Sequence, residues 1–240
     1  MENNPLVKLE QSVPSTISNN TSTDPLFTTR LQLLQNLSTV ITGWKAEENQ
    51  GIEKPEPGEF WIGPPGGQSM GRDFQAICIS WRDHALQLRG GDTSFESYQS
   101  PPKGVPPKNA DEEIFIKISS QPKTTKDGKI QVTNMWGKDV LFWIPSLSKF
   151  AVMFFHSTAR PAAANAFAAR GKLLTLHSQF VETQSFSWYT PEIQVYAKTI
   201  ESGSIALPRD ADLKEEMTKF LNPIPRGDGR VTTTDSGQVR

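Results

Sequence analysis

The sequence predicts a mainly β domain with few helices, on the evidence of its chain breakers, its apolar runs and one short alanine-rich segment. The 240 residues include 18 prolines and 17 glycines, and only 36% are hydrophobic, which fits one core domain flanked by loose segments. Strand-like apolar runs follow one another without crossover helices, which favours an antiparallel sheet that closes on itself. A single helix between late strands favours a small, OB-like antiparallel barrel, with a β-sandwich as the alternative.

The first 58 residues are expected to form three segments ahead of the core. Residues 1–23 are rich in Asn, Ser and Thr, a composition typical of disorder in isolation. Asp24 and Pro25 are typical of a helix start, and apolar residues then recur three to four positions apart, which predicts an amphipathic helix over residues 24–45. Residues 46–58 are charged and broken by proline and glycine, as in a linker. The apolar face of the helix is expected to pack on the core domain, on a second copy in a homo-oligomer or on another protein.

The β-rich core is expected to span residues 59–198. Residues 74–88 are expected to form one long strand or a bent hairpin, and residues 113–119 alternate as a strand does. The acidic run at residues 111–113 is then expected to protect a strand edge.

The most apolar part of the chain runs from Trp136 to Tyr196. It contains two apolar runs, a short helix expected at Pro161–Arg170, and two further strands. Proline near the start of this helix and glycine after Arg170 are typical helix boundaries. Residues 199–240 are expected to form a polar C-terminal extension with a second short helix at Ala211–Leu221.

No set of residues in the sequence is typical of catalysis, so we expect a protein that is not an enzyme and needs no cofactor. The three histidines stand at no metal-ligand spacing, and no serine lies in a GxSxG motif. The glycine-rich residues 63–71 are not followed by the lysine that a phosphate-binding loop requires. The one cysteine, Cys78, excludes an internal disulfide and lies in an apolar run, where we expect it to be buried.

Aromatic side chains that neighbour cations give the strongest functional signal. The chain has 6 Trp, 3 Tyr and 13 Phe, and residues 59–198 carry 15 basic against 12 acidic side chains, whereas residues 1–58 carry 4 against 7. Proteins bind single-stranded nucleic acid by stacking bases on aromatic rings in a cationic groove. The alternative for each ring is a place in the core. The residues expected to bind single-stranded DNA are Arg72, Trp81, Arg82, Lys117, Trp136, Lys138, Lys172, Trp188 and Tyr189.

The stretch FHSTARPAAANAFAARGKL, together with the later SWYTPEIQ, resembles an uncharacterised family of bacteriophage proteins. The resemblance covers about half of the chain, and it implies a phage-encoded protein that binds single-stranded DNA in replication or recombination. The sequence departs from the family in lacking a cysteine-containing loop before the central strands, and it also lacks the acidic tail common among phage and bacterial single-stranded-DNA-binding proteins. Metal binding by such a loop and partner recruitment by such a tail are therefore not expected. The matching positions are Ser157, Thr158, Ala159, Ala163, Gly171, Trp188, Tyr189 and Pro191.

The alternative function is that of a structural or interaction subunit in a larger assembly, either a virion or a complex related to host defence. Long polar ends, proline-rich loops and a net charge of −1 suit such a subunit. The N-terminus lacks the pattern of a secretory signal, and every apolar run is far shorter than the roughly 20 residues of a membrane span. We therefore expect a soluble, cytoplasmic protein without a membrane partner.

Overall fold

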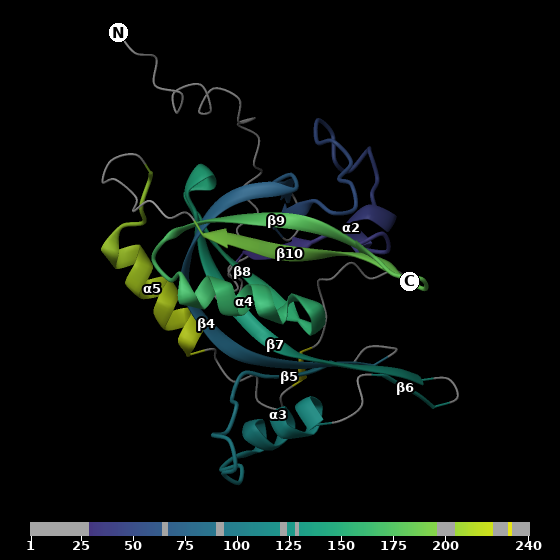
Figure 1. Cartoon of the computed structure of the whole chain (residues 1–240), viewed down its shortest axis with the longest axis vertical. Helices are drawn as coiled ribbons and strands as arrows, with labels where there is room; N and C mark the ends of the chain where they lie inside the picture. Colours follow the sequence, from purple (N-terminus) through teal and green to yellow (C-terminus); the bar gives the residue numbers. More distant parts are fainter. Residues whose placement is uncertain are drawn as a thin grey trace.

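The computed structural model describes residues 29–63, 67–89, 94–120, 124–127, 130–195, 205–222 and 230–231. The expected disordered segment at residues 1–23 lies outside them, as does most of the expected extension after residue 222. Within the described residues the protein is mainly β, with few helices and one strongly curled sheet that forms a half barrel (Figure 1). This arrangement agrees with the expected barrel-like plan, and the described strands form one sheet rather than the two of a sandwich.

The main path of the sheet runs in the order β10–β9–β4–β7–β8–β1–β2–β3. Its neighbouring strands are antiparallel, except that β1 and β8 are parallel. The strands are β1 (Arg30–Leu33), β2 (Phe60–Ile62), β3 (Gln68–Ser69), β4 (Asp73–Arg89), β5 (Ser94–Ser97), β6 (Thr124–Asp127), β7 (Ile130–Ile144), β8 (Lys149–His156), β9 (Leu173–Glu182), β10 (Ser187–Val195) and β11 (Arg230–Val231).

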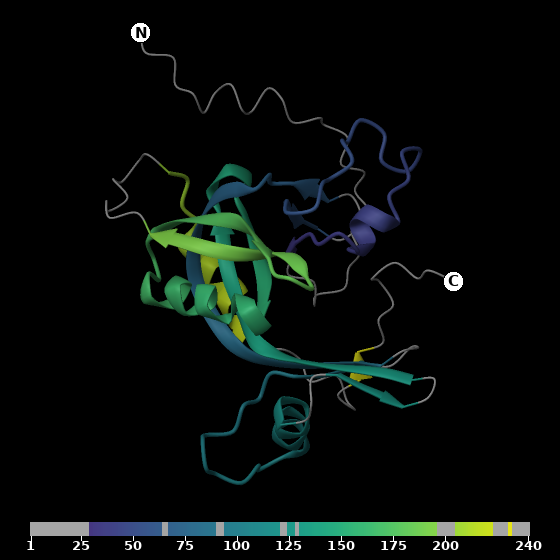
Figure 2. The same cartoon turned by 45° about the vertical axis from the view of Figure 1, so that its right-hand side comes forward.

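The two longest strands, β4 and β7, continue from the half barrel into a ribbon that also contains β5 and β6. We call this part the lower ribbon. β4 pairs with β9 over residues 73–77 and with β5 over residues 85–88. β7 pairs with β8 over residues 137–144 and with β6 over residues 130–133. Figure 2 shows both strands leaving the curled part of the sheet and continuing into the ribbon. Their mutual pairing therefore joins the two parts of the molecule.

A β-bulge at Ile79 changes which side chains of β4 face the inside of the half barrel. The register between β4 and β7 shifts between Cys78 and Ser80. Before the bulge, even-numbered residues such as Cys78 lie in the core, and after it the odd-numbered residues take over that face. Trp81 therefore follows Cys78 on the concave face, and His84 lies on the convex face.

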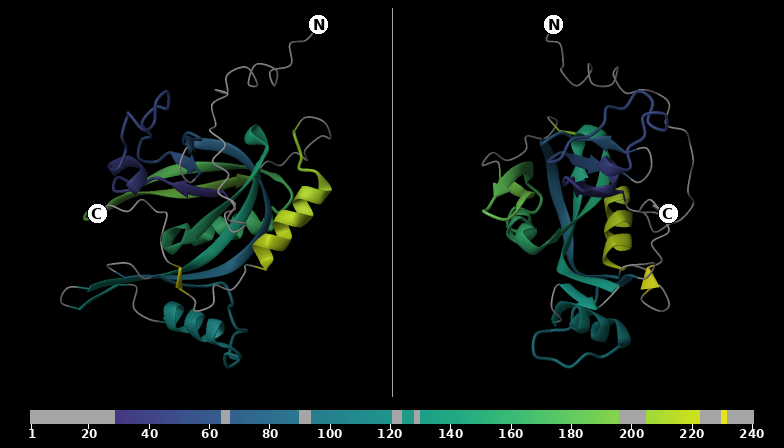
Figure 3. Two further views of the ribbon diagram at one scale, coloured as in Figure 1. Left: turned by 180° about the vertical axis from the view of Figure 1, so that it is seen from behind. Right: turned by 90° about the vertical axis from the view of Figure 1, so that its right-hand side faces the viewer.

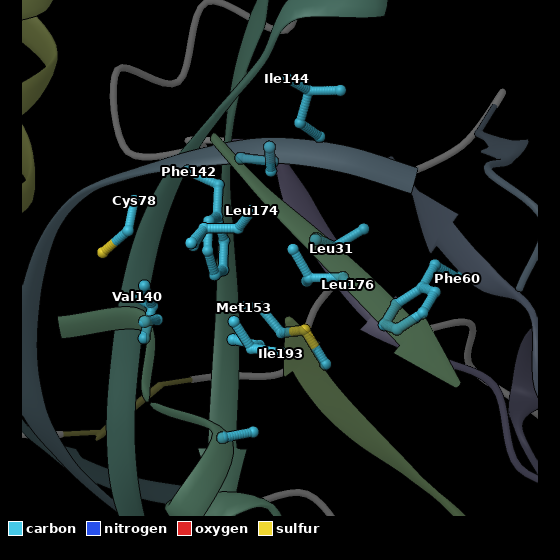
Figure 4. Close-up of a cluster of buried hydrophobic side chains, with 14 of the residues drawn as sticks. Leu31, Phe60, Cys78, Val140, Phe142, Ile144, Met153, Leu174, Leu176 and Ile193 are labelled. Atoms are coloured by element: carbon cyan, nitrogen blue, oxygen red, sulfur yellow. The ribbon is translucent and has the colours of Figure 1, made fainter. Parts of the chain in front are cut away.

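The main core fills the concave side of the half barrel beneath α4 (Figure 4). Cys78 is fully buried there, as expected, and burial raises the pKa of its thiol to about 11. The small alanine side chains on the inner face of α4 let the helix backbone approach the sheet closely. The core residues labelled in Figure 4 are Leu31, Phe60, Cys78, Val140, Phe142, Ile144, Met153, Leu174, Leu176 and Ile193.

The helices cover both faces of the β4–β7 pair. α4 lies on the concave face and α5 on the convex face, as the right-hand view in Figure 3 shows, and both lie where the sequence predicts helices. None of the helices within the described residues is long and apolar enough to span a membrane. The α-helices are α2 (Thr39–Thr42), α3 (Ala110–Ser120), α4 (Arg160–Ala168) and α5 (Asp210–Leu221), with 3-10 turns at Pro145–Leu147 and Ser157–Ala159.

The expected amphipathic helix over residues 24–45 is replaced, in its described part, by a strand and a single helical turn. β1 pairs with β2 and β8, and Leu31 is buried between Ile62 and Met153, which are its register partners. Leu37, which the helix would have placed on its apolar face, is 86% exposed. Strand pairing thus overrides the helical spacing, and the expected partner contact through this helix has no helix to carry it.

The expected strand at residues 113–119 is also wrong, because the segment belongs to α3. The Asn109 side chain accepts a hydrogen bond from the Glu112 backbone N–H at 2.9 Å, as an N-cap does. The acidic run at residues 111–113 lies in the first turn, where the helix dipole favours negative charge, and it does not protect a strand edge. Phe115 and Ile118 lie three residues apart on the buried side, a spacing that places them on one face of a helix but on opposite faces of a strand.

One side chain connects the two sides of the half barrel. The amide of Gln35, just after β1, donates to the backbone carbonyl of Tyr189 at 2.8 Å and accepts from its N–H at 2.9 Å. This pair of bonds imitates strand pairing between β10 and the segment after β1. The Tyr189 ring lies on Gly58, where an added Cβ would lie 2.4 Å from a ring carbon. A glycine is therefore required beneath this ring.

We expect Gln35→Met to lower the free energy of unfolding by about 1–3 kcal/mol, because both backbone groups of Tyr189 would lose their partner in a partly buried site. Gln32→Met is the matched control, since Gln32 is exposed on β1. Urea denaturation of the two variants and the wild type measures the difference. Equal midpoints for all three proteins would show that the Gln35 bonds do not hold the two sides together.

Candidate nucleic-acid interface

Two partly exposed tryptophans lie on the concave face of the β4–β7 pair, beyond the main core. Trp81 is 41% exposed and Trp136 is 39% exposed. Trp81 lies opposite Val140, and Trp136 lies opposite Ala85, so all four residues share one face of the sheet. Val140 is covered from the α4 side and Ala85 packs against α3. The tryptophans therefore lie between the parts of the sheet that the two helices cover.

Residues of α4 contact both tryptophan rings. The Phe167 ring stacks on Trp81, with centroids 4.7 Å apart and planes inclined by 25°. The guanidinium carbon of Arg160 lies 4.8 Å from the centroid of the Trp136 ring. Both contacts have the geometry of favourable aromatic and cation–π pairs. The helix thus lines one side of the tryptophans along its whole length.

The cations near the tryptophans differ in how far their charge is compensated. Lys138 Nζ lies 4.2 Å from the Trp81 centroid, and it forms an ion pair with Asp83, the residue opposite on β4. Arg160 is exposed and donates to the carbonyl of Ser157 at 3.3 Å, and no carboxylate in the described part of the chain pairs with it. Arg160 is therefore the cation better placed to meet a phosphate. We call Trp81, Trp136, Lys138, Arg160 and Phe167 the tryptophan strip.

Two further predicted residues, Arg72 and Tyr189, meet at the base of the β9–β10 hairpin. The Arg72 guanidinium carbon lies 5.6 Å from the Tyr189 centroid, and the side chain also approaches Glu56 at 3.6 Å. Phe180, the register partner of Tyr189, lies 5.2 Å from it between ring centroids and is 51% exposed. These residues form a second group of rings with a cation.

The other predicted binding residues are dispersed. Lys117 is exposed on α3 and Lys172 is exposed just after α4. Trp188 is half-buried on the face of β10 opposite Tyr189, with Val181 as its register partner. The structure brings none of these three side chains to the tryptophan strip.

Arg82 lies on the convex face and has a structural role. Its guanidinium donates to Asp139 at 3.0 and 3.2 Å and to the backbone carbonyl of Phe220 in α5 at 2.6 Å. The guanidinium also lies 3.7 Å from the Tyr98 ring centroid and 4.6 Å from that of Phe220. The bulge at Ile79 places Arg82 on this face, and the expectation of a DNA contact for it is therefore not supported by its position.

A buried network surrounds His84 next to Arg82. His84 is fully buried, with Nδ1 at 2.8 Å from Asp139 and Nε2 at 2.5 Å from Glu96 of β5. Its ring lies between those of Tyr98 and Phe154, at centroid distances of 4.6 and 4.2 Å. Such enclosure leaves no path to a substrate. The role of the network is structural, since it joins β5 and α5 to the convex face of the β4–β7 pair.

The network favours a charged histidine between two charged carboxylates. Burial lowers the pKa of His84, but Asp139 and Glu96 outweigh burial and raise the pKa above its ordinary value. Burial likewise raises the pKa of Asp139, but the charges of His84 and Arg82 outweigh it and hold the pKa below its usual range. The pKa of Glu96 is lowered in the same way, against burial, by His84. The guanidinium of Arg30 adds a further positive charge near both carboxylates.

Three residues of the two ring groups are absent from the sequence-based prediction. Phe167 was expected only as part of an alanine-rich helix, Arg160 only as the residue before that helix, and Phe180 only as part of a strand. Arg160 precedes proline at a helix start, where a cation faces the positive end of the helix dipole, and this unfavourable placement is a signal that sequence reasoning can use. Phe167 and Phe180 carry no such signal, because their partners are distant in the sequence.

We expect the free energy of unfolding to fall as pH rises above about 6.5, the ordinary pKa of histidine. A histidine with a raised pKa in the folded state stabilises fully below that value and loses its contribution as pH rises through the folded pKa. The two carboxylates act in the opposite sense, and their contribution is lost as pH falls below about 4, through their lowered folded pKa values. Urea denaturation from pH 3 to 8 measures both limbs and stays below the range in which Cys78, with its raised pKa, also makes stability fall with pH. His84→Gln should remove the decline on the alkaline side, and the same alkaline decline in that variant would contradict this assignment.

The comparisons with known proteins identify no relatives for this arrangement. No protein-family model, no curated protein and no solved structure gives a significant match to the chain. The described residues also contain no cluster of three or more His, Cys, Asp and Glu side chains arranged to hold a metal ion. The geometry of the two ring groups is therefore the main observation that bears on function.

Proposed function

We propose that the protein binds single-stranded DNA without sequence preference, as a non-enzymatic protein, through the tryptophan strip. The observation that supports this most directly is the pair of exposed tryptophans on one concave face, each with a cation against its ring. Bases of any sequence have an aromatic face, so rings bind them without reading the sequence. The curled sheet gives the strip a rigid floor, because both tryptophans come from the paired strands β4 and β7.

Stacking, rather than charge, would supply most of the affinity. Each base stacked on a ring contributes about 1–3 kcal/mol, and the two rings are exposed to a similar extent, with Phe167 stacked on Trp81 and Arg160 against Trp136. The charge of Lys138 is largely offset by Asp83, which leaves Arg160 as the main phosphate contact of the strip. Each phosphate contact contributes about 0.7 to the slope of log affinity against log salt. Binding at the strip should therefore depend only weakly on salt.

The proposal extends to an OB-like plan for the half barrel and to a role in phage DNA replication or recombination in the host cytoplasm. Its support is the concave sheet with aromatic side chains on its open part, together with the resemblance of the central stretch to the phage family. Neither of these two observations involves a catalytic residue, which agrees with a role in binding.

A protein–protein contact is the second candidate function, and the apolar side chains near the β9–β10 hairpin favour it. Phe186 at the tip of the hairpin is 75% exposed, and Leu37, near Gln35, is 86% exposed. Exposed apolar side chains mark an interaction surface where they form one contiguous patch. A structural or interaction subunit would use this end of the molecule.

We expect Trp136→Leu to weaken binding of a fluorescently labelled oligothymidine by roughly 5- to 150-fold, because the loss of one stacked base costs about 1–3 kcal/mol. Leucine keeps an apolar side chain on the sheet, so the fold should be unchanged. Fluorescence anisotropy at low and moderate salt measures the affinity, with duplex DNA and an RNA strand of equal length as competitors. Failure of the wild-type protein to bind at low salt would overturn the proposed function.

We also expect Arg160→Glu to weaken binding, since it places a negative charge where a phosphate would lie. Lys214→Glu makes the same change in charge at an exposed residue of α5, on the convex face, and is the matched control. The control should change affinity little, because it is remote from the strip. An equal loss in both variants would mean that only the net charge of the protein matters and that the strip is not the binding site.

A further inference from the structure

The β9–β10 hairpin extends beyond the sheet and carries aromatic side chains. β4 begins at Asp73, opposite His177, so the part of the hairpin after residue 178 has no β4 strand beside it. An isolated two-stranded ribbon is only marginally stable. Here the Gln35 bonds to Tyr189 hold its base in place. The projecting part is therefore a positioned arm rather than a free loop.

The arm has the chemistry of a nucleotide contact. Phe180 is 51% exposed next to the Tyr189 ring, and the guanidinium of Arg72, the residue just before β4, lies against that ring. Half of the Arg72 side chain is exposed, and among the described residues its polar partners are the carboxylate of Glu56, 73% exposed and 3.6 Å away, and the carbonyl of Pro57 at 3.3 Å. Such exposed contacts are weak, so Arg72 can turn toward a phosphate at little cost.

The start of α4 is close both to the tryptophan strip, through Arg160 and Trp136, and to β10 of the arm. The curled path of β4 brings its two ends to one side, so the β9–β10 hairpin lies above α4 and the lower ribbon lies below it (Figure 1). Figure 2 shows the same relation from a second direction. The start of α4, which carries Arg160, lies between the hairpin and the ribbon, and the turn before it contacts β10. A strand on the tryptophan strip thus has the arm on one side of its path.

We propose that Phe180, Tyr189 and Arg72 form a second contact for single-stranded nucleic acid, reached only by strands long enough to continue from the tryptophan strip across the start of α4. The inference rests on the proposed function and adds the length of strand that the protein engages. Phe180 supplies an open ring for a base, and Arg72 supplies the cation for a neighbouring phosphate. Short strands occupy the tryptophan strip alone.

The test compares two oligothymidines, one of about 6 and one of about 20 nucleotides, lengths within and above the range that a single small binding domain covers. Phe180→Ala should weaken binding of the longer strand roughly tenfold and leave the shorter strand unaffected, whereas Trp136→Leu should weaken both. Leu207→Ala is the matched control. Leu207 is exposed and follows Ala206, whose carbonyl accepts from the Trp143 indole on the convex face, so this variant removes an exposed apolar side chain far from either contact.

The outcomes separate the two proposals. Equal losses for both lengths in Phe180→Ala, or no loss for either, would overturn the second contact while the function through the tryptophan strip stands. No binding of either length by the wild-type protein would overturn the function and the inference together. Thermal denaturation of each variant checks that the fold is unchanged, which is expected because Phe180 and Leu207 are exposed.

Discussion

The pairing of β4 with β7, interrupted by the bulge at Ile79, is the constraint on which the rest of the structure depends. These strands form the longest continuous ladder in the described sheet, and both the half barrel and the lower ribbon are built on it. Because of the extra residue, even-numbered side chains of β4 face the concave side before the bulge and odd-numbered side chains face it afterwards. Without it, Arg82 and His84 would point into the concave side, and Trp81 would point toward α5. One inserted residue thus separates the ionic network from the aromatic face.

The buried network makes the convex side a rigid support. Burying charged groups costs free energy unless each has partners, and here His84, Asp139, Glu96 and Arg82 form ion pairs with one another. Arg82 also reaches the end of α5 through the carbonyl of Phe220. Gly137 is required where β7 passes β8, because a Cβ there would lie 1.9 Å from the carbonyl oxygen of Phe155. A surface that stacks bases needs such a fixed floor, since an ordered ring loses less entropy on binding.

The two ring groups differ in what they offer a ligand. In the tryptophan strip the rings are partly covered by Phe167, Lys138 and Arg160, so their orientation is fixed but their free area is limited. In the hairpin arm Phe180 is more open, and Tyr189 is held by Gln35 and Gly58. A fixed site and a more open arm together suit a ligand that is itself flexible and varied in sequence. Asp83 beside Lys138 and Glu56 near Arg72 reduce the net positive charge of the two ring groups, so the proposed binding would depend mainly on the rings.

The sequence by itself determined the features that depend on local patterns: the β-rich class, α4 between proline and glycine, α5, and burial of Cys78 in an apolar run. It predicted Trp81, Trp136 and Lys138 as binding residues. It also grouped Arg82 with them, although Arg82 lies on the convex face, and it did not include Arg160. The tertiary structure decided whether residues 30–33 pair as a strand, since apolar spacing alone fits a helix as well. It also decided that residues 110–120 form a helix, because the Asn109 cap and the burial of Phe115 outweigh an alternating pattern of β-branched residues. Most of all, the bulge at Ile79 set the faces of β4, and a register shift depends on the partner strand, which no local pattern records.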